Sequence, residues 1–120
     1  MPALTLAQRS CTACYGLSGP LSKNKVLRLL RSLSGWRLSG DGRTISIEIL
    51  LQDFMSAIRL IHRIAAIAEK EGHHPDLHLT GYRKLKIDLR THTVGGLSEN
   101  DFILAAKIDR LPKRLKKIKS

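Results

Sequence analysis

The chain has 120 residues, enough for one domain with a single core, and its hydrophobic content of 42% is typical of a globular rather than a disordered protein. No apolar run approaches the ~20 residues that a membrane-spanning helix requires, so we expect a soluble protein. The formal net charge of +11 is concentrated at the two ends. Residues 1–40 carry six basic and no acidic side chains, residues 107–120 carry seven and one, and the residues between them are nearly balanced.

This division of charge suggests three segments. We expect residues 1–21 to form an N-terminal extension, residues 22–112 a single domain, and residues 113–120 a basic C-terminal tail. The tail could attract a nucleic acid through weak electrostatic binding, but a solvated, frayed terminus is the favoured interpretation. The first 20 residues lack the apolar core of a secretory signal. A cytoplasmic location is therefore expected, with an organellar transit peptide as the open alternative.

The two cysteines, Cys11 and Cys14, form one pair within the extension. A tetrahedral zinc site needs four ligands, and the sequence has no second cysteine pair to complete one. A redox role stays open, although the pair does not lie between a strand and a helix as it does in thioredoxin-like proteins. Incidental cysteines in a loop are the favoured interpretation.

The first part of the domain predicts a helix followed by a β-hairpin. Ser22 can cap a helix over residues 23–33, and Gly35-Trp36 ends it. The run Gly40-Asp41-Gly42 is a hairpin turn signal, and residues 44–50 then alternate between apolar and polar side chains. The apolar positions are Val26, Leu27, Leu30 and Leu33 in the helix and Ile45, Ile47 and Ile49 in the strand.

The rest of the domain predicts a long helix over residues 53–70 that ends at Gly72, short strands over 77–80 and 84–90, and a last helix capped by Ser98. The apolar positions are Phe54, Ala57, Ile58, Ile61, Ile64, Ala65 and Ala68, then Leu85, Ile87 and Leu89, then Phe102, Ala105, Ile108 and Leu111. The order α-β-β-α-β-β-α favours an α+β protein in which a four-stranded antiparallel sheet carries three helices on one face.

Three of the five histidines lie where chemistry explains them better than packing does. His73 and His74 are adjacent, just past the end of the long helix and before Pro75, and His92 follows the last strand. The unperturbed pKa of histidine lies near neutrality, so a cluster of these side chains can donate and accept protons at cellular pH. The two histidines that fit no motif and are interpreted as structural are His62 and His78.

The polar residues around this cluster follow a spacing that resembles the signature of the pterin-4a-carbinolamine dehydratase family; they are Glu69, His73, His74, Pro75, Tyr82, His92 and Asp101. Gly35-Trp36 and the run from Thr91 to Phe102 (THTVGGLSENDF) are also similar to that family, over about residues 22–111. Cys11 and Cys14 resemble the N-terminus of one of its branches. Each residue alone has a plain structural explanation, such as a helix cap for Asp101. The joint spacing is what favours a functional site.

The resemblance implies a hydro-lyase that removes water from 4a-hydroxytetrahydropterin to give quinonoid dihydropterin in tetrahydropterin recycling, with residues 22–112 as the catalytic domain and no metal or other cofactor. Expelling hydroxide from C4a requires a proton donor, and the ring N5–H must lose a proton. By the same resemblance, His73 and His92 are the candidates for general acid and base, and His74 positions the pterin. Which of His73 and His74 acts on the proton stays open. The supporting positions are Glu69, Pro75, Asp76, Tyr82, Thr91 and Asp101, and the carboxylates could orient an imidazole or favour its charged form.

Two other functions compete with this one. Members of the family also serve as dimerisation partners of transcription factors, and related proteins assist assembly of a carbon-fixing enzyme, so a binding protein is the first alternative. The presence of all three histidines favours catalysis. A zinc hydrolase built on His73, His74 and His92 is disfavoured, because adjacent histidines on a loop project in different directions. The family implies a homodimer or homotetramer, for which an exposed strand edge gives a physical motive.

Overall fold

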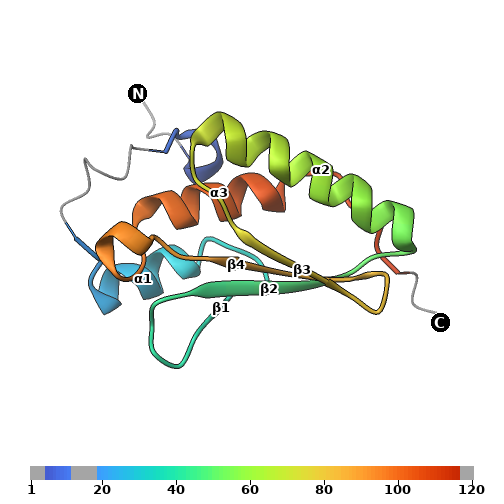
Figure 1. Cartoon of the computed structure of the whole chain (residues 1–120). Coiled ribbons are helices and arrows are strands. Elements are labelled where there is room, and N and C mark those ends of the chain that lie inside the picture. The colour runs from blue at the N-terminus through green and yellow to red at the C-terminus, as the bar shows by residue number, and fades with distance from the viewer. Residues whose placement is uncertain (1–4, 12–18, 117–120) are drawn as a thin grey trace.

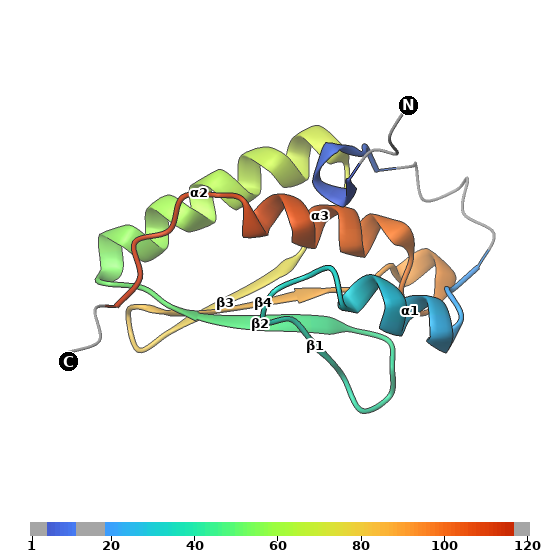
Figure 2. The ribbon, with the colours of Figure 1, turned by 180° about the vertical axis from the view of Figure 1, so that it is seen from behind.

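The computed structural model describes residues 5–11 and 19–116 and contains a four-stranded antiparallel sheet with its three helices on one face (Figures 1 and 2). The strand order across the sheet is β1-β2-β4-β3. The elements in chain order are η1 (Leu6–Gln8), α1 (Lys23–Leu30), β1 (Arg37–Leu38), β2 (Ile45–Leu50), α2 (Phe54–Glu71), β3 (Asp76–Thr80), β4 (Lys84–Leu89), η3 (His92–Val94) and α3 (Glu99–Asp109). The predicted α+β fold and the order of its three helices and four strands are confirmed.

The two central strands show the predicted alternation. Leu85, Ile87 and Leu89 of β4 are fully buried, whereas the residues between them face away from the core. The antiparallel register pairs Ile45 of β2 with Leu89, and Ile49 with Leu85, so the buried side chains of both strands lie on the same face. That face is the one that α2 and α3 cover (Figure 2).

α1 ends at Leu30, three residues before the predicted end. The chain continues in turns, in which the N–H groups of Ser32 and Leu33 donate to the carbonyl oxygens of Leu29 and Leu30, each at 3.1 Å. Leu33 nevertheless packs against the core, as its place in the apolar stripe predicts. The sequence therefore identified the buried side chains of this segment better than the point where the helix ends.

α2 has nearly the predicted length, and only part of its predicted apolar stripe is buried, namely Ala57, Ile64 and Ala68. The Asp53 carboxylate caps it by accepting from the Ser56 N–H (2.8 Å), and Gly72 ends it with φ of +66°. The buried side chains are Ser56, Ala57, Leu60, Ile64 and Ala68, whereas Phe54, Ile58 and Ala65 of the predicted stripe are exposed. Two adjoining faces of this apolar helix satisfy a spacing of three and four residues. Packing against the sheet and α3 selects the face with mainly small or slender side chains.

The described part of the N-terminal extension packs on α3. The Lys107 ammonium donates to the Ala7 carbonyl (2.9 Å), and Arg9 forms an ion pair with Glu99 (2.9 Å). The Cys11 N–H donates to Glu71 (2.8 Å), and burial, followed by the Glu71 carboxylate, raises the pKa of the Cys11 thiol to about 12. A thiol with so high a pKa is a weak nucleophile at neutral pH. Cys14 lies outside the described residues.

The start of the basic C-terminal tail differs from the frayed terminus that we expected. The Arg114 carbonyl accepts from the Gln52 N–H (2.7 Å), the Lys116 N–H donates to the Leu50 carbonyl (3.0 Å), and Leu115 forms a β-bridge with Leu51. Residues 114–116 thus run beside the link between β2 and α2, where unpaired backbone groups of that link attract a further strand-like segment. Within the described part of the chain, no helix is long and apolar enough to cross a membrane.

Candidate active site

The three histidines of the motif lie at the same end of the sheet, past the ends of α2 and β4. His73 and His74 follow the C-terminus of α2, and the Thr91-His92 pair follows the end of β4. The antiparallel β3–β4 pairing sets Asp76 opposite Asp88, so the entry to β3 lies beside the exit from β4. The left-handed conformation of Gly72 turns the chain out of α2, and the His73 N–H still donates to the Ala68 carbonyl (3.2 Å). The backbone therefore brings the two segments together at one end of the sheet.

A buried carboxylate, Asp101 of α3, joins these segments. One of its oxygens lies 2.6 Å from His73 Nε2. The other accepts from the Thr91 hydroxyl (2.8 Å) and from the Ser98 N–H (2.9 Å). Asp101 is fully buried and His73 is 5% exposed. A buried carboxylate needs donors on its oxygens, and this one has three, from a histidine, a hydroxyl and a helix N-terminus.

The hydroxyls of Thr91 and Ser98 complete this network. Thr91 Oγ1 and Ser98 Oγ lie 2.7 Å apart, and both side chains are buried. Because the Thr91 hydroxyl donates to Asp101, the Ser98 hydroxyl is the donor in this second bond. Both carboxylate oxygens of Asp101 are thereby satisfied, and the position of the carboxylate is fixed from three sides.

Asp101 determines which nitrogen of His73 is available for chemistry. A carboxylate accepts hydrogen bonds, so it takes the Nε2–H of His73 and leaves Nδ1 as the other functional nitrogen. In a neutral imidazole of this tautomer Nδ1 carries a lone pair and can accept a proton. The buried pair thus holds one imidazole in a single orientation and a single tautomer, as a proton-transfer group requires.

His74 and His92 are accessible, in contrast to His73. The His74 side chain is 62% exposed, and its Nε2 lies 2.8 Å from a carboxylate oxygen of Glu69 in the last turns of α2. His92 is exposed at the start of η3, a single 3-10 turn that ends at Gly95 with φ of +68°. The Thr91 N–H donates to the Gly96 carbonyl (2.8 Å) and closes this turn. One buried and two accessible imidazoles therefore share this end of the molecule.

The structure does not bring every predicted residue to the histidines. Pro75 and Asp76 continue directly from His74 into β3. Tyr82 lies in the turn between β3 and β4 with φ of +56°, exposed, at the other end of a five-residue strand that is about 17 Å long. In one chain Tyr82 is thus remote from His73 and His92.

The remaining groups have other positions. His62 is exposed on α2, and His78 of β3 pairs with Asp88 (3.1 Å). The sequence indicated Ser98 only as a helix cap and missed its hydroxyl bond to Thr91; the Ser98-x-x-Asp101 spacing of a capping box was the available signal. Among the described residues, no group of three or more His, Cys, Asp and Glu side chains could hold a metal ion.

Comparison with known proteins identifies the class to which this fold and this site belong. The chain belongs to the family described as pterin 4 alpha carbinolamine dehydratase, which matches residues 19–111, and it is thus a member of a hydro-lyase family. It is 42% identical over 106 residues to a putative pterin-4-alpha-carbinolamine dehydratase of Nitrosospira multiformis, covering 88% of this chain and 91% of that protein. It is 40% identical over 109 residues to the mitochondrial pterin-4-alpha-carbinolamine dehydratase 2 of Arabidopsis thaliana, covering 88% of this chain and 58% of that protein.

Two solved structures share the fold. A transcriptional coactivator/pterin dehydratase from Brucella melitensis superposes with a TM-score of 0.71 at 29% identity and covers 75% of this chain and 95% of its own. A pterin dehydratase-like protein described as a RuBisCO assembly factor in the alpha-carboxysome superposes with a TM-score of 0.53 at 22% identity, covering 62% and 86%. The second similarity concerns the fold alone.

Proposed function

We propose that this protein removes water from 4a-hydroxytetrahydropterin to give quinonoid dihydropterin, by histidine general acid–base catalysis, in tetrahydropterin recycling. The observation that carries the proposal is the buried His73–Asp101 pair (2.6 Å) beside two accessible histidines. Burying an imidazole and a carboxylate together costs free energy of desolvation, which packing alone does not explain. An imidazole held in one orientation is suited to proton transfer. The family of the chain supplies the substrate class.

The reaction needs two proton transfers. The C4a–O bond breaks as the leaving hydroxyl takes up a proton and departs as water, and N5–H loses a proton as the C4a=N5 double bond forms. His73, through Nδ1, and His92 are the proposed acid and base: one donates a proton to the leaving hydroxyl, and the other accepts the proton that N5 loses. Residues 22–112 form the proposed catalytic unit, with no metal or other cofactor.

The other residues of the site have positioning roles. Asp101 orients His73, while Thr91 and Ser98 hold Asp101. His74 is exposed and paired with Glu69, so it is suited to contact the pterin ring and hold it against the reacting histidines. Pro75 and Asp76 fix the path from this loop into β3. Tyr82 is not part of the proposed set, because it lies at the far end of the hairpin.

A binding or assembly protein is the alternative, and the exposed apolar side chains of α2 are the surface that it would use. Phe54 and Met55 are 49% and 54% exposed, and Ile58 lies one turn further on. Apolar side chains gathered in this way are typical of an interface. We propose that they serve a homodimer or homotetramer in a cytoplasmic protein; a transcription factor or an assembly client would be a different partner for the same surface.

A stopped-flow assay of 4a-hydroxytetrahydropterin dehydration tests the enzyme proposal. We expect the wild type to accelerate the reaction over buffer, and His73→Ala and His92→Ala each to lower kcat by about 10²- to 10⁴-fold, because general acid–base groups contribute about that much. His62→Ala is the matched control, since it removes an exposed histidine of α2 outside the site. Lack of acceleration by the wild type would leave the binding function in its place.

A further inference from the structure

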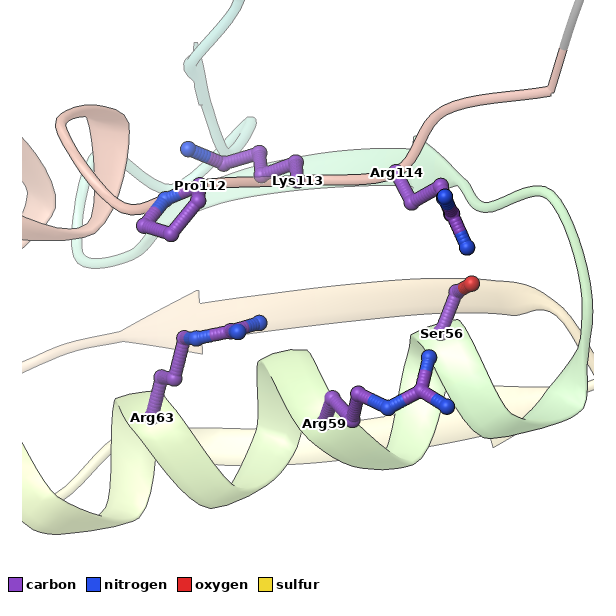
Figure 3. A pocket seen from close by; sticks show the side chains of 6 residues that line it. All are labelled: Ser56, Arg59, Arg63, Pro112, Lys113 and Arg114. Atoms are coloured by element: carbon purple, nitrogen blue, oxygen red, sulfur yellow. The ribbon is translucent and has the colours of Figure 1, made fainter.

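A polar cavity of about 320 Å³ lies between α2 and the segment that follows α3 (Figure 3). Its lining residues are Ser56, Arg59, Arg63, Pro112, Lys113 and Arg114. Ser56, Arg59 and Arg63 recur at three- and four-residue spacing and so share one face of α2. The backbone bond from Gln52 to Arg114 (2.7 Å) fixes the opposite wall. The cavity thus joins two segments that are far apart in the sequence.

Three guanidinium groups line this cavity without an ion-pair partner. Within the described part of the chain, Arg59, Arg63 and Arg114 have no carboxylate within 4.0 Å. Two of these arginines act on the Asp53 carboxyl, whose pKa is lowered first by Ser56 and to a smaller extent by Arg59 and Arg114. One carboxylate leaves most of the positive charge uncompensated. Unpaired cations that converge on one cavity raise the local concentration of anions there.

Lys113 has a different role from the arginines. Its ammonium donates to the carbonyl oxygens of Ile108 (2.6 Å), Asp109 (3.1 Å) and Leu111 (3.0 Å), and so caps the C-terminus of α3. Desolvation lowers the pKa of Lys113. Its three carbonyl acceptors nevertheless hold the side chain in this position. The lysine therefore shapes the wall of the cavity, and the arginines are left to bind a ligand.

Ser56 is the second observation that points to a ligand. Its side chain is 3% exposed, and its hydroxyl makes no hydrogen bond of normal geometry, although it lies near enough to Asp53 to affect that carboxyl. A buried hydroxyl that meets a carboxylate only outside normal hydrogen-bond geometry is incompletely satisfied, and such groups are rare and call for an explanation. Figure 3 shows its oxygen directed toward Arg114, which extends from the opposite wall.

We propose that this cavity binds the phosphate group of a small phosphorylated molecule. Arg59 and Arg114 hold the phosphate oxygens through charge-assisted, bidentate hydrogen bonds, and the Ser56 hydroxyl donates to the same group. Arg63, one turn along α2, is placed for a second phosphate of a diphosphate. A volume of about 320 Å³ exceeds what a single ion needs and falls in the range of small-molecule sites.

This cavity is separate from the proposed active site. Ser56 lies near the N-terminus of α2, and His73 follows its C-terminus, about 25 Å away at 1.5 Å per residue. Substitutions in the cavity therefore leave the histidines and Asp101 untouched. The proposal does not rest on the dehydratase function, and each can fail without the other.

Isothermal titration calorimetry of the full chain at constant ionic strength tests the proposal. The probes are inorganic phosphate, inorganic pyrophosphate and a nucleoside diphosphate. We expect saturable binding with one site per chain, tighter for pyrophosphate than for phosphate because Arg63 is then engaged. Tighter binding of the nucleoside diphosphate than of pyrophosphate would identify an organic phosphate as the ligand, and the reverse order would identify the inorganic anion.

Three variants and a matched control make the test specific. We expect Arg59→Gln and Arg114→Gln to weaken pyrophosphate binding about tenfold or more, as the loss of one charge-assisted hydrogen bond does. Ser56→Ala should weaken it about three- to tenfold, because one hydroxyl donor to the phosphate is removed. Arg28→Gln removes the same charge from an exposed position of α1 and should change binding less than twofold.

Three outcomes would overturn the proposal. The first is the absence of saturable binding by any of the three probes. The second is binding that Arg28→Gln weakens as much as Arg59→Gln does, since this would indicate attraction by net charge alone. A short DNA duplex serves as the competing polyanion; binding of the duplex without binding of pyrophosphate would likewise contradict a small-ligand site.

Discussion

Asp101 combines two functions that a single side chain rarely serves together. It lies in the first turn of α3, where a carboxylate accepts the N-cap N–H, and it holds the ring of His73. The cap places the carboxylate, and the carboxylate places the histidine. The orientation of the His73 imidazole, the proposed proton-transfer group, thus depends on where a helix begins, through hydrogen bonds that the core shields from water.

Asp101→Asn tests this dependence. The amide oxygen can still accept from Thr91 and Ser98, but its NH₂ then faces His73 Nε2 and favours the opposite tautomer. We expect the free energy of unfolding to fall by about 1–3 kcal/mol. We expect kcat to fall by about 10²- to 10⁴-fold, as tautomer reversal does in other carboxylate–histidine pairs, with KM within about threefold of wild type. Unfolding in urea and steady-state kinetics measure both effects. An unchanged kcat in a folded variant would exclude His73 as a proton-transfer residue.

The spacing of the histidines and Asp101 was readable in the sequence, but the bonds between them were not. His73 and Asp101 are separated by 28 positions, and only packing of α3 against the end of α2 brings them together. A motif shows that residues belong together without showing which nitrogen faces which oxygen. The sequence could not distinguish a buried His73 from an exposed His74 for the same reason, since neighbours in a loop differ only through tertiary packing.

The two ends of the helix α2 serve different purposes. Near its N-terminus, Ser56 and Arg59 line the polar cavity. At its C-terminus, Gly72 turns the chain so that His73 and His74 lie in the proposed active site. The stop at Gly72 was predictable, because glycine supplies the left-handed conformation at low cost. The buried face of α2 was predictable only in part: Ala57, Ile64 and Ala68 are buried as expected, whereas Phe54 and Ile58 satisfy the same spacing and are exposed.

Gly72→Ala tests the helix end. The added Cβ meets no atom within 4 Å, so its cost is the left-handed backbone at φ of +66°. We expect a loss of about 1 kcal/mol in the free energy of unfolding, with lower kcat because His73 and His74 follow directly. Urea unfolding and the dehydration assay measure these. Gly40→Ala is the matched control: it also meets no atom within 4 Å and requires no left-handed backbone. Equal loss in both variants would contradict the role of Gly72.

Most of the net positive charge of the molecule lies in segments outside the histidine site. The proposed active site is made of imidazoles and carboxylates, whereas unpaired arginines lie at the other end of α2. The sequence showed this division as two basic ends around a balanced middle. It could not show that the second basic end folds back on the sheet, because the bonds from Arg114 and Lys116 run between backbone atoms and leave no side-chain pattern.

Deletion of residues 113–120 tests the contribution of this returning segment to the whole fold. The truncated chain loses two backbone hydrogen bonds to Leu50 and Gln52 and the Lys113 cap on α3. We expect its free energy of unfolding to fall by about 2–4 kcal/mol, which urea denaturation followed by circular dichroism measures. A chain that ends at Lys116 is the control; it lacks residues 117–120 but keeps each of these bonds, so its stability should match that of the full chain. If both truncations were as stable as the full chain, the segment would be a passive tail. Loss of stability in the longer deletion alone would show that this basic end is part of the folded domain.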